Sequence, residues 1–214
     1  MSALRSLAYL VCAAALAPTV ATAQAAPAAA IPGKVILEAR LRHEFVDQEG
    51  FSDKANALTL RTRFGWSSPK TDGFIFLIEG ENVTALVDDY NSTTNGRTAF
   101  PIVADPEGTE LNRLQLAFAN ETTEAVLGRQ RLIFDNGRFI GNGGFRQNEQ
   151  TFDAALLTLR PRKDTSFTYV YLDQVLKTSG PKHPQGRWQS DSHLLRAETA
   201  TPIGKLVGYG YLFD

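Results

Sequence analysis

The sequence predicts an all-β protein: an antiparallel transmembrane β-barrel of up-and-down meander topology, with about nine strands in this chain. Three observations predict this class. Apolar and polar residues alternate with a period of two along most of the chain. The connections between these segments are long and short in turn, and aromatic residues gather near one end of the predicted strands.

The N-terminal residues 1–23 have the features of a cleaved signal peptide. Arg5 supplies a positive charge, residues 7–16 are apolar, and Ala21-Thr22-Ala23 is a small-residue cleavage site. The apolar run is shorter than the roughly 20 residues of a membrane-spanning helix. Residues 24–33 are rich in Ala and Pro and are predicted to form a flexible leader. Residues 34–214 are then the N-terminal part of the barrel.

The first predicted strand, residues 34–45, alternates most clearly. Its odd positions are nearly all apolar: Val35, Leu37, Ala39, Leu41, His43 and Phe45. Its even positions include the charged residues Glu38, Arg40, Arg42 and Glu44. A helix would scatter these residues around its circumference, whereas a strand places them on two opposite faces.

Eight further segments repeat the pattern with varying clarity. They lie near residues 58–66, 74–81, 113–118, 124–132, 152–156, 167–171, 195–198 and 207–213. In the sixth strand, the pattern assigns Phe152, Ala154 and Leu156 to the apolar, outward face. In the ninth, it assigns Val207, Tyr209, Tyr211 and Phe213 to that same face.

The connections keep a strict order of long and short. The long ones span residues 46–57, 84–110, 133–149 and 175–192, and the short ones 67–73, 120–123, 160–164 and 201–205. Barrels of the bacterial outer membrane have short periplasmic turns and longer outer loops. A soluble sandwich with Greek-key crossings has no reason to keep that order.

Aromatic residues near the short-turn ends resemble an interfacial girdle: Phe64, Trp66, Phe74, Phe118, Phe167 and Tyr209. The alternative is that they form the core of a β-sandwich. Bacterial single-chain barrels normally close with an even number of strands. Nine strands ending at Asp214 therefore predict an incomplete barrel in this chain.

Charge and cysteine content exclude several function classes. The formal net charge is −1, so the basic surface typical of nucleic-acid binding is not expected. The single cysteine, Cys12, lies in the predicted signal peptide, so the mature chain has no thiol for a disulfide or a metal. No cofactor, metal site or catalytic group is predicted. The acidic stretch 88–91, with Asp105 and Glu107, offers oxygen ligands for calcium but lacks a regular spacing.

The face opposite the apolar one is predicted to line a pore. Its charged residues are Arg40, Arg42, Arg61, Arg63, Glu79, Glu81, Arg113, Arg129, Arg131 and Asp153. Rings of arginine select anions, because guanidinium binds carboxylate and phosphate through two hydrogen bonds. Glu79 and Glu81 follow Arg61 and Arg63 on the next strand, so cross-strand ion pairs would instead brace the wall. Both interpretations remain open at this point.

The loop 133–149 is the candidate constriction. Its glycines permit tight folding, and five polar residues would face the pore if the loop folded inward: Asp135, Arg138, Asn142, Arg146 and Asn148. The alternative is a solvated surface loop.

Several motifs resemble the alginate-export-type porins of Gram-negative bacteria. They are residues 58–63 (LTLRTR), 79–82 (EGEN), 88–91 (DDYN), 127–131 (LGRQR) and 144–153 (GFRQNEQTFD). The resemblance covers nearly all of the mature chain. It implies an outer-membrane barrel with about twice as many strands, and an arginine-rich conduit that takes anionic sugars in the name-giving members.

The predicted function is therefore an exported outer-membrane channel, not an enzyme, for passive passage of small or anionic solutes such as sugar acids or anionic polysaccharide. Its partners would be outer-membrane lipid and these solutes, without nucleic acid. The alternative is a soluble periplasmic β-sandwich that binds carbohydrate.

Overall fold

The computed structural model describes residues 32–214. The predicted signal peptide, and the predicted leader up to residue 31, lie outside the described residues. The described part forms nine strands: β1 (Lys34–Val46), β2 (Ala55–Ser67), β3 (Phe74–Asp89), β4 (Gly108–Ala119), β5 (Thr123–Gln130), β6 (Thr151–Arg162), β7 (Thr165–Leu176), β8 (Arg187–Thr201) and β9 (Gly204–Leu212).

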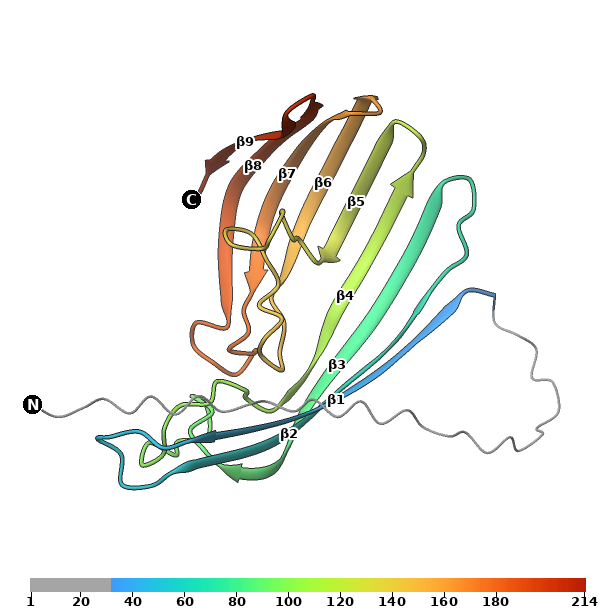
Figure 1. Cartoon of the computed structure of the whole chain (residues 1–214). Coiled ribbons are helices and arrows are strands. Elements are labelled where there is room, and N and C mark those ends of the chain that lie inside the picture. The colour runs from blue at the N-terminus through green and yellow to red at the C-terminus, as the bar shows by residue number, and fades with distance from the viewer. Residues whose placement is uncertain (1–31) are drawn as a thin grey trace, which may run out of the picture. The chain divides into compact units, whose positions relative to one another are not determined.

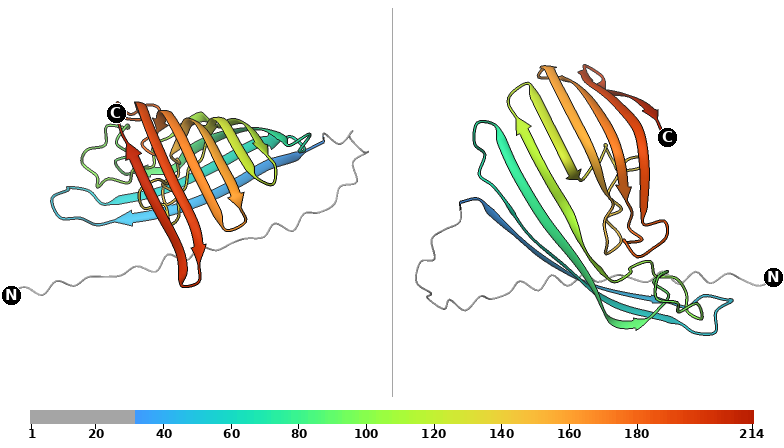
Figure 2. Two further views of the ribbon diagram at one scale, coloured as in Figure 1. Left: turned by 90° about the horizontal axis from the view of Figure 1, so that it is seen from above. Right: turned by 180° about the vertical axis from the view of Figure 1, so that it is seen from behind.

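The strands form one antiparallel sheet in sequence order, β1 to β9, as Figure 1 shows. The predicted up-and-down meander is therefore confirmed, and the sheet is a single curved layer rather than the two packed sheets of a sandwich (Figure 2). Within residues 32–214, β1 pairs only with β2 and β9 only with β8, so the sheet stays open, consistent with an incomplete barrel. No helix among these residues is long and apolar enough to cross a bilayer.

Cross-strand register explains why each face keeps its character. Arg40 stands opposite Arg61, whereas the neighbouring Leu41 stands opposite Leu60. Residues opposite each other in an antiparallel pair project to the same face. Alternation on single strands is thereby extended into an apolar face and a polar face shared by the whole sheet.

The apolar face is exposed on almost every strand. Leu37 is 83% exposed, Phe64 54% and Phe167 52%. At the short-turn end of β3 and β4, the rings of Phe74 and Phe118 pack at a centroid distance of 5.0 Å. An apolar surface this wide is unfavourable in water, and it is the surface that a barrel presents to lipid.

Two of the sequence-based assignments to the apolar, outward face are wrong. Phe152 and Ala154 of β6 are buried in a cluster with Leu132 and Ile140, which both lie in the connection between β5 and β6. They therefore face inward, and β6 turns Leu157 and Leu159 outward instead. The short apolar run 154–157 has no polar residue to distinguish its two faces, so alternation alone chose the wrong one.

Tyr209 is the second wrong assignment. It stands opposite Arg196 in the β8–β9 pair, and its hydroxyl donates a hydrogen bond to Asp135 of the connection after β5. Tyr209 therefore lies on the polar face and not in an outer girdle. The outward positions of β9 are occupied by Gly208 and Gly210, opposite Ala197 and Leu195.

Candidate functional site

The segment 131–150, which we call the inner loop, lies against the polar face of the sheet (Figure 1). Near its start, Asp135 accepts hydrogen bonds from Arg196 of β8 at 2.7 and 3.2 Å. Towards its end, residues 144–147 bind side chains and backbone of β1 and β2. The inner loop thus connects strands from the two ends of the sheet.

Arg40 of β1 fixes the tip of the inner loop. Its guanidinium donates hydrogen bonds to three successive carbonyls, those of Gly144, Phe145 and Arg146, at 3.1, 3.0 and 3.1 Å. No carboxylate among residues 32–214 pairs with Arg40. Its hydrogen-bond partners are three peptide oxygens, and the Asp105 carboxylate, which is paired with Arg42, acts on it only electrostatically.

Gln147 anchors the loop next to that point. Its side chain is fully buried, and its amide nitrogen donates to the hydroxyl of Thr59 at 2.8 Å and to the Thr59 carbonyl at 3.0 Å. Arg61 donates to the Gln147 carbonyl at 3.2 Å, and the Gln147 backbone N–H donates to Asp105 at 2.9 Å. A buried amide needs such partners, because a buried donor or acceptor without a hydrogen bond costs about 1–3 kcal/mol.

Glu149 is the centre of a buried ionic cluster. It is 2% exposed and accepts hydrogen bonds from Arg131 at 2.7 and 2.8 Å. Arg63 approaches its other side at 3.2 Å, and Asn112 and Asn142 donate to its two oxygens. Buried charges persist in proteins only when they are paired and hydrogen-bonded. The end of the inner loop is therefore fixed to β2 and β4 by charge as well as by packing.

Glu79 and Glu81 extend this cluster along β3. Arg113 binds Glu79 with two hydrogen bonds of 2.9 and 2.6 Å, and Arg63 binds Glu81 at 2.6 Å. Of the cross-strand pairs expected between Glu79, Glu81 and the β2 arginines, only Arg63 with Glu81 forms. In the β2–β3 register Arg61 stands opposite Val83, and its guanidinium binds Glu38 on the other side instead.

The connection between β3 and β4 also contacts the inner loop. Asp105 is fully buried, pairs with Arg42 and accepts the hydrogen bond from Gln147. Asn148 donates to the Pro106 carbonyl at 2.9 Å. Tyr90 donates to the Asp105 carbonyl at 2.9 Å, and burial, together with the nearby Asp105 carboxylate, raises the Tyr90 pKa well above its ordinary value.

The remaining candidate residues take separate positions. Arg129 binds Asp153 with two hydrogen bonds of 2.8 Å each, next to Gly128, where a φ of +108° interrupts the regular strand. In the register Arg129 stands opposite both Leu114 of the apolar face and Asp153, so this pair lies on the outward face and not on the predicted pore-lining face. Arg146 lies 3.4 Å from Glu44. Arg138 is near the ring of Phe139, 5.8 Å from its centroid, and has no contact with the sheet among the described hydrogen bonds and ion pairs.

The electrostatics follow from this pairing. Of the arginines named so far on the inner face or inner loop, those bound to a carboxylate are Arg42, Arg61, Arg63, Arg113, Arg131, Arg146 and Arg196. The geometry therefore favours the interpretation in which most arginines brace the wall. Arg40 and Arg138 are the exceptions, and of these two only Arg40 contacts the sheet.

Four buried polar residues of the site are absent from the predicted pore-lining and constriction residues: Asp105, Asn112, Gln147 and Glu149. Three of them lie in or beside connections, where no periodicity marks a face. Asn112 is the extra residue where the β3–β4 register shifts after Glu79. No group of three or more acidic or histidine side chains within the described range is arranged to hold a metal ion.

The calcium ligands considered above have other partners. Asp88 and Asp89 pair with Arg97, and Glu107 accepts a hydrogen bond from the backbone N–H of Ala85 at 2.8 Å. The acidic stretch is thus tied to the loop's own arginine and backbone.

Comparison with known proteins places the fold. No family model and no curated protein matches the sequence. The chain is similar to the crystal structures of OccD3 (OpdP) from Pseudomonas aeruginosa, at 18% identity and a TM-score of 0.56, and of OccAB3 from Acinetobacter baumannii, at 12% and 0.64. It is also similar to that of a BenF-like porin from Pseudomonas fluorescens Pf-5, at 14% identity and a TM-score of 0.60.

These matches cover 88%, 83% and 84% of this chain, but only 43%, 49% and 49% of the three structures. The chain therefore spans less than half of their length. At these identities the likeness concerns the fold alone. The described residues share the fold of about half of each of these three structures.

Proposed function

We propose that this chain forms part of the wall of an outer-membrane channel through which small solutes pass, and that the inner loop narrows the passage. The observation that carries this proposal is the inner loop itself. It is bound to β8 by Asp135 and to β1 and β2 by residues 144–147. A loop held at both ends across a polar concave wall restricts the cross-section available to a solute.

The position in the membrane is part of the proposal. The exposed apolar face and the fold of the structural relatives support a barrel with lipid outside and water inside. Export through a signal peptide of residues 1–23 is proposed with it. The described residues form one sheet with its apolar face uncovered, so they do not favour the soluble sandwich.

A preference for anionic solutes is the finer part of the proposal. It rests on Arg40, whose guanidinium has carbonyl partners only. The resemblance to alginate-export-type porins points to sugar acids or anionic polysaccharide, whereas the BenF-like porin and the Occ proteins are similar in fold only. Because the other arginines that contact the inner face are bound to carboxylates, we expect the preference for anions to be modest.

Conductance across planar bilayers tests both parts. The complete channel, of whose wall this chain forms part, should open in the bilayer, and Arg40→Gln should lower its anion over cation permeability, measured as a shift of the reversal potential in a salt gradient. Arg160→Gln is the matched control, because Arg160 forms its ion pair with Glu124 near a short turn. Absence of channels would overturn the proposal, and an unchanged reversal potential would remove the anion preference.

A further inference from the structure

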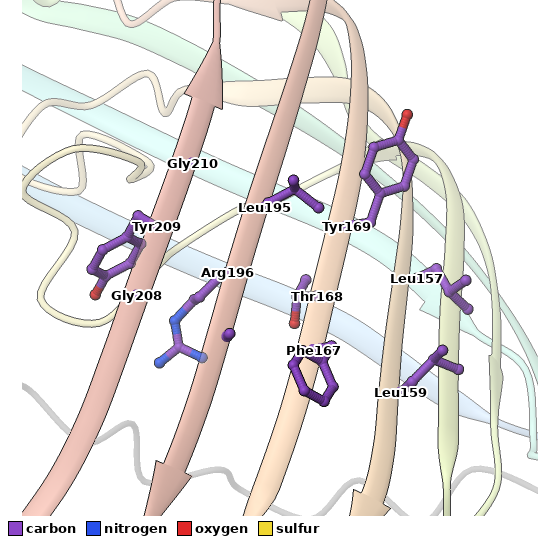
Figure 3. Close-up of a pocket in the computed structure, with 11 residues that line it drawn as sticks. Leu157, Leu159, Phe167, Thr168, Tyr169, Leu195, Arg196, Gly208, Tyr209 and Gly210 are labelled. Carbon is purple, nitrogen blue, oxygen red and sulfur yellow. The ribbon is translucent and has the colours of Figure 1, made fainter.

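The outward face of β7, β8 and β9 contains a shallow apolar trough (Figure 3). One hollow of about 490 Å³ is lined by residues that include Phe167, Tyr169, Leu195 and Gly210. A second hollow of about 400 Å³ adjoins it and shares Phe167 and Gly208 with it. Together they form one depression that runs along the strands.

Cross-strand register gives the trough its shape. Gly208, Ala197 and Phe167 stand in one row across the three strands, and Gly210, Leu195 and Tyr169 stand in the next. Within each row, the side chains are small on β9 and aromatic on β7. The floor therefore consists of Gly208, Gly210 and Ala197, with Leu195 on β8 and the two rings on β7 beside it.

The two glycines are not required by the backbone. Neither Gly208 nor Gly210 has a positive φ. A Cβ at Gly208 would meet no atom within 4 Å, and one at Gly210 would lie 3.8 Å from the Cβ of Leu195. Glycine weakens a strand interior, because it loses more conformational entropy and packs no side chain. What these glycines provide is the space itself.

A polar group of side chains closes the trough toward the long-loop end of the strands. In the row above Tyr169, Tyr171 stands opposite His193, with ring centroids 5.5 Å apart. The hydroxyl of Tyr169 and Nδ1 of His193 form a hydrogen bond of 2.8 Å. Hydrocarbon-lined space thus leads up to hydrogen-bonding groups at the end where the strands would leave the membrane.

We propose that this trough binds the acyl chain of an outer-membrane lipid, with the Tyr169–His193–Tyr171 group facing the polar part of the same molecule. The inference rests on the proposed position of the chain in the membrane. Between Leu206 and Gly210, which both line the trough, β9 extends by about 13 Å. One leaflet of the hydrocarbon core is about 15 Å thick, half of roughly 30 Å. The trough therefore has the length, polarity gradient and direction of a lipid chain that stands along the strands.

Photolabelling tests this directly. The protein is reconstituted in vesicles of phosphatidylethanolamine and phosphatidylglycerol, in which a fraction of the phosphatidylethanolamine carries a diazirine on a palmitoyl chain. Mass spectrometry then locates the label. We expect β7 and β8 peptides with Phe167 and Leu195 to carry about fourfold more label than the β1 peptide with Leu37, the preference given by burial of one extra methylene.

Filling the trough provides the second measurement. Gly208→Leu combined with Gly210→Leu should reduce labelling at Phe167 to the level of Leu37. Ala39→Leu adds the same side chain to the outward face of β1, outside the trough, and should change nothing. The wild-type ratio alone also decides the question, so the inference stays testable if the double variant does not fold.

Equal labelling of β1 and β7 in the wild type would overturn the inference. So would crosslinks between two copies of the chain at Phe167 that disappear in the double variant, because the occupant would then be a second copy. The double variant should keep the wild-type conductance. A protein that shows enriched label but forms no channel would contradict the proposed function and leave the lipid site in place.

Discussion

The Nε of Arg131 donates to both carboxylate oxygens of Glu149, at 2.7 and 2.8 Å, and so joins the two ends of the inner loop. Arg131 is the residue at which the chain leaves β5, and Glu149 precedes β6. The pair therefore closes the loop at its base. Because Arg63 and Asn112 also bind Glu149, the base is fixed to β2 and β4.

Glu149→Gln should destabilise the protein strongly. The variant leaves the Arg131 and Arg63 guanidinium groups without a formal negative charge in a buried site, and breaking a buried pair costs about 3–5 kcal/mol. We expect the free energy of unfolding in urea, measured in detergent micelles, to fall by about 3 kcal/mol. Glu124→Gln is the control, because its pair with Arg160 is 41% exposed on both sides, and should cost less than about 1 kcal/mol. Equal losses would contradict the buried-cluster account.

Asp135→Asn should remove a stabilisation that depends on pH. Hydrogen bonds from Arg196 and then from Tyr209 lower the Asp135 pKa from its ordinary value of 3.8 to about 2. A lowered folded-state pKa stabilises the fold fully above the unfolded value, and that contribution disappears as pH falls through the folded value. The difference in unfolding free energy between wild type and variant should be constant above about pH 5 and shrink between about pH 4 and pH 2. A difference that does not change over this range would contradict the role of Asp135.

Gly128→Ala should destabilise the sheet, because the backbone there has a φ of +108° and a Cβ would lie 2.3 Å from the Leu114 carbonyl oxygen. Strained positions of this kind cost about 1–3 kcal/mol. Gly208→Ala is the matched control, because its Cβ meets no atom within 4 Å. It should leave the stability unchanged or raise it by about 0.5–1 kcal/mol. Urea unfolding of both variants measures the contrast, and a neutral Gly128→Ala would show that the interruption of β5 is not needed.

Period-two alternation predicted the fold because each strand has one apolar and one charged face. In residues 37–45 apolar and charged residues alternate, with His43 as the one exception, and the β1–β2 register preserves this order without a shift. Alternation failed at Phe152 and Tyr209. There the inner face is itself apolar or aromatic, because the inner loop packs against it. The period of two was still visible in these strands, but it did not show which of the two faces points inward.

The site was less predictable, because ion pairs depend on register and on loops. Arg61 and Glu79 lie on the consecutive strands β2 and β3. Arg61 nevertheless stands opposite Val83, and Glu79 binds Arg113. A register shift after Glu79 also brings Asn112 into the buried cluster. Gln147 and Glu149 lie in a connection without periodicity, so nothing in the sequence distinguishes them from solvated neighbours.

The central claim is that the sheet separates lipid from a water-filled passage. Gln115 and Leu116 are neighbours on β4, and in the β3–β4 register they stand opposite Leu77 and Phe76 on opposite faces of the wall. The chain's one cysteine, Cys12, lies in the predicted signal peptide, so single-cysteine variants are straightforward to interpret. The measurement is the conductance of Gln115→Cys and Leu116→Cys in planar bilayers, before and after a charged, membrane-impermeant methanethiosulfonate reagent. We predict that modification lowers the conductance of Gln115→Cys and leaves that of Leu116→Cys unchanged. Modification of both, or of Leu116→Cys alone, would contradict the account.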